Sequence, residues 1–338
     1  MADTRTITGT DTDVEYPNER VFAFTPYYVS LSSEMSAGTE YTIEFNGFTV
    51  KRYLNTSSND NIPISGMLQS FFANTEFGDV GTFTSNLNSA SKLFLQNKNI
   101  VIEIGVDTFT LTFDIVWGAI QPAIREKSVI PLYMFAGLPL TITQNIGTDL
   151  VWGGTTTYGF GKEVLLSGIS AATGQAILRN STATETYKIY NVKYISCVPE
   201  NSIYLRWVDV EGEYKYYLLN IAERINTAEF TTYFNRYPTY LNPTPGTLPS
   251  LVKNRIAYTE KKNNNRIIAG VMAADDELTA HLESLNGSLL QWIYSKEGSA
   301  VTWTECVVLG MSIGRKTREG NRQIDFEIQL PELYNQRL

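Results

Sequence analysis

Short runs that alternate apolar with polar residues recur along most of this 338-residue chain. Residues 21–32 (VFAFTPYYVSLS) and 40–54 (EYTIEFNGFTVKRYL) are two such runs, and Asn46-Gly47 lies inside the second. A period of two places alternate side chains on opposite faces of a β-strand, and Asn-Gly between two such runs favours a tight hairpin turn. Residues 98–118 repeat this arrangement around Gly105-Val106-Asp107. The sequence therefore predicts a mainly β protein.

Residues 202–221 (SIYLRWVDVEGEYKYYLLNI) form the most aromatic of these runs. Both halves alternate around a central Glu-Gly-Glu, which predicts a hairpin with apolar side chains on both faces. One face is expected to belong to the core, and the other to pack on a second layer or on a partner chain. The aromatic residues available for such an interface are Tyr204, Trp207, Tyr214, Tyr216 and Tyr217. A sugar-stacking platform is the weaker alternative, because it needs exposed rings in a concave setting.

Two segments show helical spacing instead of alternation. Residues 63–72 (PISGMLQSFF) repeat apolar side chains at helical intervals, which predicts one short amphipathic helix. Residues 275–287 (DDELTAHLESLNG) begin with acidic residues and end in Asn286-Gly287, which predicts a second helix with a defined start and stop.

Composition divides the chain into five segments. Residues 1–19 are rich in Thr and Asp and lack a period, which predicts a flexible N-terminal arm or one that becomes ordered on a partner. Residues 236–250 are rich in proline, which predicts an extended linker. The remaining segments are an N-terminal β domain with one short helix (20–125), a central β domain (126–235) and a C-terminal β-α-β-β-β unit (251–338).

Charge and hydropathy limit the partners of the chain. The net charge of −8 argues against binding nucleic acid by neutralising phosphates. The longest apolar run, residues 129–142, is short for a bilayer span and contains two prolines, so no membrane insertion is expected. The polar opening predicts no secretory signal. Cys197 and Cys306 lie in apolar, strand-like contexts and are expected to be buried free thiols.

Residue types that carry catalysis are sparse. The only histidine, His281, lies in the second predicted helix on the face shared with Glu277 and Leu285, and we interpret it as a half-exposed structural residue. A Ser/His/Asp triad stays open as an alternative, although no nucleophile elbow supports it. One histidine and two distant cysteines exclude the common zinc spacings, and residues 9–15 lack the rest of a calcium loop. We therefore expect no catalytic residue, no cofactor and no metal.

Two polar segments have alternative interpretations. Residues 153–162 (GGTTTYGFGK) have the wrong glycine spacing for a phosphate loop, and with their aromatic neighbours they are a candidate glycan contact. The residues of this contact would be Trp152, Tyr158 and Phe160. The basic residues around Asn263–Asn265 are interpreted as a solvated hairpin tip, with contact to an acidic neighbouring subunit as the alternative. These basic residues are Lys253, Arg255, Lys261, Lys262 and Arg266.

Residues 197–219 (CVPENSIYLRWVDVEGEYKYYLL) resemble a segment of structural tail proteins from bacteriophages and prophages of Bacteroidetes. In that segment a strand reading YLRW precedes a short turn with glycine and then an aromatic strand. Residues 21–32 and 40–54 resemble the N-terminal strands of those proteins, and residues 275–294 with 325–336 resemble their closing strand-helix-strand unit. Among phage components, the arrangement is most similar to the distal tail or baseplate hub family.

This resemblance, which spans residues 20–72 and 196–338, implies a fold. In that family a β-barrel or split barrel with a short flanking helix forms a ring, usually hexameric, around the DNA channel. An additional β-sandwich-like domain often decorates the outside. We therefore expect the two flanks to build the barrel and the central section to form the additional domain.

The resemblance also implies a function. The chain is expected to be a non-enzymatic structural subunit of a phage tail, as a distal tail protein, baseplate hub or adaptor ring that contacts other tail proteins. It would be located in the virion tail, and in the host cytoplasm during assembly, and DNA would pass through the ring without specific binding. A receptor- or carbohydrate-binding module at the tail tip is the alternative, and a hydrolase acting on the cell envelope is a third reading.

Overall fold

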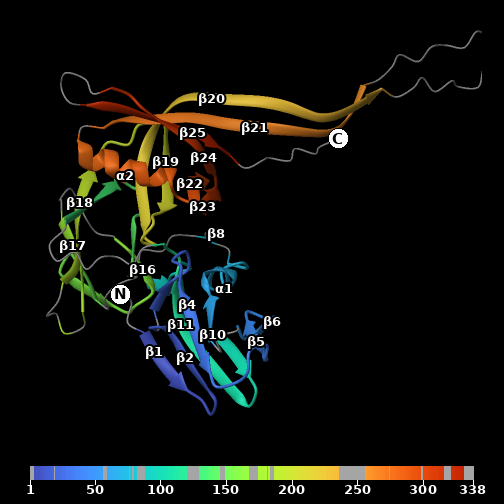
Figure 1. The fold of residues 1–338 in the computed structure, drawn as a ribbon. Coiled ribbons are helices and arrows are strands. Elements are labelled where there is room, and N and C mark those ends of the chain that lie inside the picture. The colour runs from blue at the N-terminus through green and yellow to red at the C-terminus, as the bar shows by residue number, and fades with distance from the viewer. Residues whose placement is uncertain are drawn as a thin grey trace, which may run out of the picture.

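The structure is a computed structural model, and it describes residues 4–18, 20–55, 59–75, 77, 80–81, 88–119, 129–144, 149–166, 174–180, 182, 186–235, 256–273, 275–297, 300–315 and 321–330. Over these residues the chain is mainly β, with two helices and a curled half-barrel sheet (Figure 1). The fold class predicted from the alternating runs is therefore confirmed.

Two sheets that face each other form the N-terminal part. The strands of one sheet are, in spatial order, β1 (Thr4–Thr8), β2 (Thr12–Pro17), β4 (Tyr28–Ser33) and β7 (Asn59–Pro63). Those of the other are β3 (Arg20–Phe22), β11 (Asp107–Val116), β10 (Phe94–Ile104), β5 (Glu40–Phe45) and β6 (Phe48–Tyr53). Alternate side chains of β2, β4 and β11 are buried, and Tyr16 meets Phe113 edge-on with 5.9 Å between ring centroids. This part is a β-sandwich.

Residues 1–19 were predicted to form a flexible arm, but their described part forms the paired strands β1 and β2 of this sandwich. β1 pairs with β2 from Thr4↔Pro17 to Thr8↔Asp13, and Val14 on β2 is fully buried. Between the two strands, the Asp107 carboxylate accepts hydrogen bonds from the backbone N–H groups of Thr10 and Asp11. Thr12, Val14 and Tyr16 alternate with acidic residues, and the Thr- and Asp-rich composition obscures this strand pattern.

Local features of the sandwich follow the sequence. Asn46 and Gly47 have φ values of 45° and 79° and connect the Phe45↔Phe48 pair, as a type I′ hairpin turn requires. Helix α1 (Ser65–Ser70) lies within the predicted helical segment and buries Leu68.

Two further sheets form the middle of the molecule. The strands of the five-stranded sheet are, in spatial order, β12 (Val129–Phe135), β18 (Thr186–Ile195), β17 (Gly174–Arg179), β14 (Asp149–Trp152) and β15 (Thr155–Tyr158). Those of the three-stranded sheet are β13 (Thr141–Thr143), β16 (Lys162–Leu165) and β9 (Asn88–Ala90). β12 and β18 are parallel, whereas the other pairs in these sheets are antiparallel.

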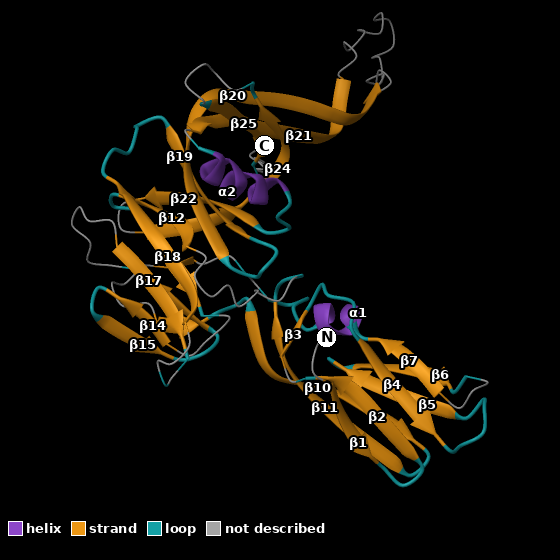
Figure 2. Ribbon diagram, turned by 60° about the vertical axis from the view of Figure 1, so that its left-hand side comes forward, coloured by secondary structure: helices purple, strands orange, loops and turns teal. Residues whose placement is uncertain are grey.

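An eight-stranded sheet curls into the half-barrel. Its strands are, in spatial order, β24 (Val307–Ile313), β25 (Arg322–Gln329), β21 (Ile256–Ala273), β20 (Tyr214–Asn235), β19 (Ser202–Val208), β22 (Gln291–Glu297), β23 (Ala300–Glu305) and β8 (Val80–Gly81). Helix α2 (Asp276–Asn286) lies against this sheet (Figures 1 and 2). The Asp275 side chain caps the helix by accepting from Leu278 N, and Gly287 follows its last turn.

This sheet corrects two expectations about domains. β20 pairs with β21 from Asn220↔Gly270 to Asn235↔Ile256, so the segments 126–235 and 251–338, expected to be separate, share one sheet. The predicted linker, residues 236–250, lies outside the described residues. Of the described residues before position 120, only β8 joins the half-barrel, through β23, so the N-terminal flank builds a sandwich and not part of the barrel.

The outer part of the β20–β21 hairpin projects from the molecule. Residues 227–235 and 256–264 pair with each other, and no third strand pairs with them within the described chain. We call these two segments the hairpin extension, which reaches past the rest of the sheet (Figure 1). The predicted polar tip at Asn263–Asn265 is therefore corrected, because these residues lie within a strand and pair with Ala228, Thr227 and Asn226.

Candidate functional site

The five aromatic residues that the sequence offered as an interface are buried within one chain. Their exposed fractions are 6% or less: Tyr204, Trp207, Tyr214, Tyr216 and Tyr217. The rings of Tyr204 and Tyr216 stack at 5.9 Å, and Trp207 Nε1 donates to Ser284 Oγ of α2 at 2.9 Å. Both faces of the hairpin are covered, as predicted, but by elements of the same chain. These side chains form core and not an interface.

Arg206 occupies an aromatic box inside this core. Its side chain is fully enclosed, and its guanidinium carbon lies 4.5 to 4.7 Å from three ring centroids, those of Tyr214, Trp292 and Trp303. Cation–π attraction offsets part of the cost of burying the charge. The ring faces that could stack on a sugar are therefore already in contact with an internal cation.

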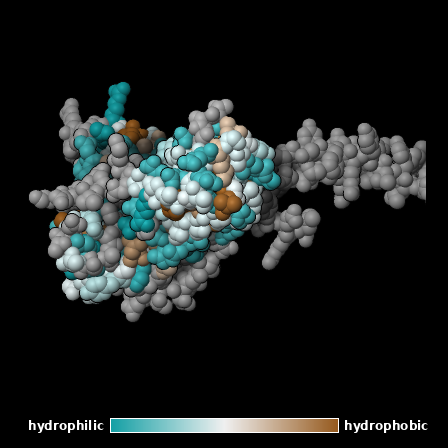
Figure 3. Space-filling view, turned by 60° about the horizontal axis from the view of Figure 1, so that its bottom comes forward, coloured by the Kyte–Doolittle hydropathy of each residue, from teal (hydrophilic) through white to brown (hydrophobic). Residues whose placement is uncertain are grey.

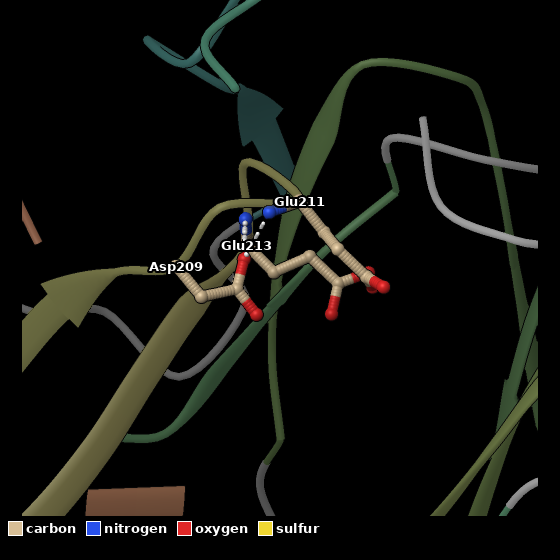
Figure 4. A group of neighbouring side chains, drawn as sticks. All are labelled: Asp209, Glu211 and Glu213. Atoms are coloured by element: carbon tan, nitrogen blue, oxygen red, sulfur yellow. Dashed lines mark hydrogen bonds between the residues drawn. The ribbon is translucent and has the colours of Figure 1, made fainter. Parts of the chain in front are cut away.

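The turn between β19 and β20 brings three carboxylates together (Figure 4). Asp209 accepts hydrogen bonds from the backbone N–H groups of Glu211 at 2.9 Å and Glu213 at 3.0 Å. Gly212 has a φ of 75°, which allows the chain to reverse. As a result, carboxylate oxygens of Asp209, Glu211 and Glu213 lie within 4.8 Å of one another.

Two lysines neutralise most of this charge. Lys188 Nζ, from β18, lies 2.6 Å from Glu211 and 2.5 Å from Glu213. Lys215 Nζ, from β20, lies 3.3 Å from Asp209 and 3.5 Å from Glu213. The Tyr190 hydroxyl also donates to Glu213, at 2.9 Å. We call these six residues the junction cluster.

The pKa values in the junction cluster follow from burial and from these ion pairs. Burial raises the pKa of Asp209, against the opposing effect of Lys215. Burial also acts on Glu213, but Lys188 and Lys215 outweigh it and hold the pKa of Glu213 below its ordinary value. Burial opposes the charge of Lys188, yet Glu213 and Glu211 keep its pKa raised. Three carboxylates are a ligand type for divalent cations, but here two ammonium groups already pair with them.

The junction cluster lies where three parts of the molecule meet. Lys188 and Tyr190 belong to the five-stranded sheet, and the turn itself belongs to the half-barrel. The sandwich also reaches the turn, because Ala119 N, just after β11, donates to Val210 O at 2.8 Å. At Gly212 a Cβ would lie 2.2 Å from Trp117 O, so a side chain there would prevent this approach.

His281 is buried beside this cluster, contrary to the half-exposed position that we expected. Its exposed fraction is 7%, and Nε2 donates to Tyr216 O at 3.1 Å. Burial, together with Lys215, lowers the pKa of His281 to about 3. The imidazole is therefore neutral at ordinary pH. Ser284 Oγ donates to the His281 carbonyl, so its hydroxyl hydrogen is used by the helix backbone.

A cavity of about 340 Å³ borders His281, Lys215, Asp209 and Glu211. It is the place in the described chain where an imidazole and clustered acids face one space. The carboxylates are paired with lysines, and a histidine with so low a pKa is a weak base at neutral pH. The ion pairs beside this cavity join β18 and β20 to the β19–β20 turn. Among the residues that line the cavity, none is an activated nucleophile.

The three residues of the candidate glycan contact do not form one surface. Tyr158 is 66% exposed, but Trp152 is half-buried at the other end of the β14–β15 hairpin, whose register pairs Trp152↔Thr155 and Asp149↔Tyr158. Phe160 packs edge-on against Phe94, and the Arg20 guanidinium lies 3.7 Å from its ring centroid. One exposed ring is left where a sugar platform needs several.

The two cysteines differ. Cys306 is buried, which raises the pKa of its thiol to about 12. Cys197 is exposed, contrary to expectation, because it lies just after the end of β18 in an irregular segment on the surface.

The basic residues that the sequence placed at a hairpin tip lie on β21 or outside the described residues. Lys261, Lys262 and Arg266 belong to β21, whereas Lys253 and Arg255 lie outside the described residues.

No protein-family model matches the sequence, and no curated protein matches it either. Among the described residues, no helix combines the length and the apolar character needed to cross a membrane. The fold and the site together define a class: a β protein of several sheets whose parts are joined by a buried ion-pair cluster.

Proposed function

We propose that the chain is a non-enzymatic structural subunit of a bacteriophage tail, at the position of a distal tail protein, baseplate hub or adaptor ring. It would assemble with copies of itself into a ring, with a hexamer favoured, and bind other tail proteins around the DNA channel. Its location would be the virion tail, and the host cytoplasm during assembly.

One observation carries this proposal. The segments that resemble tail proteins in the second half of the sequence are far apart in the chain but lie together in the half-barrel. Residues 197–219 contribute β19 and the start of β20, residues 275–294 contribute α2 and part of β22, and residues 325–336 contribute part of β25. A resemblance spread over separate loops would carry less weight than one gathered in a single sheet.

The distribution of polar groups supports the same proposal. The buried charges described above are paired with one another or stacked against rings, which suits a part that works through its surfaces. On the face shown in Figure 3, hydrophobic residues are isolated among hydrophilic and intermediate ones, over the end formed by the sandwich. The net charge of −8 is compatible with a channel wall that DNA passes without binding.

Sedimentation velocity of the purified chain over a range of concentrations, with negative-stain images of the same samples, tests this proposal. We expect ring-shaped particles with closed rotational symmetry that become more abundant as concentration rises. A gold-labelled antibody should mark the tail of intact particles. A chain that stays monomeric at all concentrations and is absent from particles would contradict the proposal.

A further inference from the structure

The hairpin extension lacks the support that a two-stranded ribbon needs. β19 pairs with β20 only over Tyr214–Asn220, and β25 pairs with β21 only over Arg266–Ala273. The nine residues on each strand of the extension therefore have one neighbour each within the described chain. Two strands alone are marginally stable in water, whereas a third strand makes a stable sheet.

The same sheet also ends in an open edge. Within the described residues β24 pairs with β25 alone. It carries no charged residue, and three of its apolar side chains are exposed: Val307 at 56%, Leu309 at 45% and Ile313 at 38%. Natural proteins blunt such edges with charges or cover them, because an open apolar edge is a template for another strand.

Hydrogen bonds show which part of this edge is free. Val308 N donates to the Gln291 side chain, so the beginning of β24 is occupied within the chain. Gly314 N donates to Gln323 O of the β25 side. Because inward and outward N–H groups alternate in an antiparallel pair, the N–H groups of Met311 and Ile313 point away from β25. Among the described residues neither group donates a backbone hydrogen bond outside the sheet, which leaves both open to a strand of another chain.

We propose that the hairpin extension of one copy pairs with the β24 edge of a second copy and covers it. β25 separates β24 from β21 within one chain, and the extension continues away from the sheet (Figure 2). The pairing therefore takes place between chains. It is heterologous, since two different surfaces meet, and such contacts close into a ring when the rotation between copies permits. This inference rests on the proposed function and deepens it by naming the contact.

Length and charge both suit this pairing. At about 3.4 Å per residue, nine extended residues span about 30 Å and seven span about 24 Å, so the extension is long enough to cover all of β24. The extension contains two glutamates, Glu229 and Glu260, and two lysines, Lys261 and Lys262. It is therefore neutral in a chain of charge −8, and it can approach the uncharged edge of another acidic copy without strong repulsion.

Three variants test the inference. In the first, residues 226–265 are replaced by Asn-Gly, because Ile225↔Arg266 is a strand pair that a two-residue turn can close. In the second, Leu309→Lys places a charge on the edge. The control is Val106→Lys, which adds the same charge to the 79% exposed tip of the β10–β11 hairpin. Sedimentation velocity and thermal melting are measured for the wild type and each variant.

We expect the first two variants to raise the concentration at which half of the chain is assembled by more than about tenfold, while the control matches the wild type. Their melting temperatures should stay close to that of the wild type under conditions where all chains are monomeric. A mixture of the two is the decisive sample, because one chain keeps the edge and the other keeps the extension. It should form a one-to-one dimer and no larger species.

The results separate the two proposals. If the wild type forms rings and the variant without the extension forms them equally well, the inference is wrong and the proposed function stands. If the mixture stays monomeric while the wild type assembles, the extension binds something other than β24. A wild type that never self-associates would overturn the inference, and if it were also absent from particles it would overturn the proposed function as well.

Discussion

The β10–β11 hairpin of the sandwich and the β19–β20 hairpin of the half-barrel look alike in sequence but are stabilised differently. Each has two apolar strands around a turn with a glycine at positive φ, 59° at Gly105 and 75° at Gly212. Along β11 nearly every second side chain is buried, whereas along β19 all but the first are. Val106 in the first turn is 79% exposed, but the second turn holds the junction cluster. The stability of the β10–β11 hairpin depends on packing within its own sandwich, whereas that of the β19–β20 hairpin depends on contacts from three parts of the molecule.

Lys188→Met is expected to lower the free energy of unfolding more than the other variants. It removes the ammonium group of β18 that pairs with the carboxylates of the β19–β20 turn. The carboxylates of Glu211 and Glu213 would lose their closest ammonium group while remaining mostly buried. Breaking a buried ion pair from one side costs about 3–5 kcal/mol of unfolding free energy. Urea denaturation followed by tryptophan fluorescence measures this loss.

The matched control is Lys193→Met, on the same strand. Lys193 pairs with Glu277 at 2.8 Å, but both side chains are more than 30% exposed. An exposed ion pair contributes less than about 1 kcal/mol. Equal losses in the two variants would mean that burial of the junction cluster does not matter for stability.

Replacing each turn glycine by alanine is expected to destabilise the two hairpins to different extents. The difference in unfolding free energy should be smaller than the one between the two lysine variants. A Cβ at Gly212 would lie 2.2 Å from Trp117 O, a backbone atom that is fixed by the approach of the sandwich. A Cβ at Gly105 would also lie at 2.2 Å, but from Met35 Cε, the end of a flexible side chain. We expect Gly212→Ala to cost about 2–4 kcal/mol and Gly105→Ala about 1–2 kcal/mol, because both have positive φ but only the first overlaps the backbone.

Thermal denaturation of both variants checks this difference. Hydrogen exchange would show which residues lose protection in each variant. We expect the loss near Trp117–Ala119 and β18 for Gly212→Ala, and within the sandwich for Gly105→Ala. If the two alanines are equally tolerated, the turn at Gly212 has room to move away from the sandwich, and the three-part junction is looser than its contacts suggest.

The elements that the sequence predicted well depend on local patterns. Alternation around Gly105 predicted β10 and β11, and Asn46-Gly47 predicted a tight turn that the φ values match. Acidic residues before an apolar period predicted α2, whose cap is Asp275. In each case the residues that determine the structure lie next to one another in the chain.

The junction cluster could not be predicted because its members come from distant strands. Glu-Gly-Glu has the composition of a solvated turn, and only the position of Lys188 on β18 makes it a buried ion-pair site. The aromatic box of Arg206 could not be predicted for the same reason, because the rings that enclose it include Trp292 and Trp303, more than 80 residues further along the chain. The N-terminal strand β2 was missed for a different reason, since its alternation is carried by Thr12 and two apolar residues within a polar composition.

His281 should make stability depend on pH through the half-barrel hairpin and not through the sandwich. The imidazole bonds to Tyr216 on β20, and burial with Lys215 lowers its pKa to about 3 from an ordinary value of 6.5. The unfolded chain therefore takes up a proton below pH 6.5 that the folded chain refuses. Stability is complete above this pH and falls as the pH decreases toward 3. Between pH 7 and pH 5 the loss is about 2 kcal/mol.

His281→Gln isolates this contribution, because the chain has no other histidine and the amide can still donate to the Tyr216 carbonyl. Urea denaturation at pH 7 and at pH 5 gives the free energy of unfolding for both proteins. We expect the variant to lose less than half of what the wild type loses between the two values. The only histidine of the sequence lies in α2 and not in the sandwich, so hydrogen-exchange protection in β10 and β11 should change less than that in β19 and β20. An equal pH dependence in wild type and variant would show that the carboxylates of the junction cluster, and not the buried imidazole, set the response of this hairpin to acid.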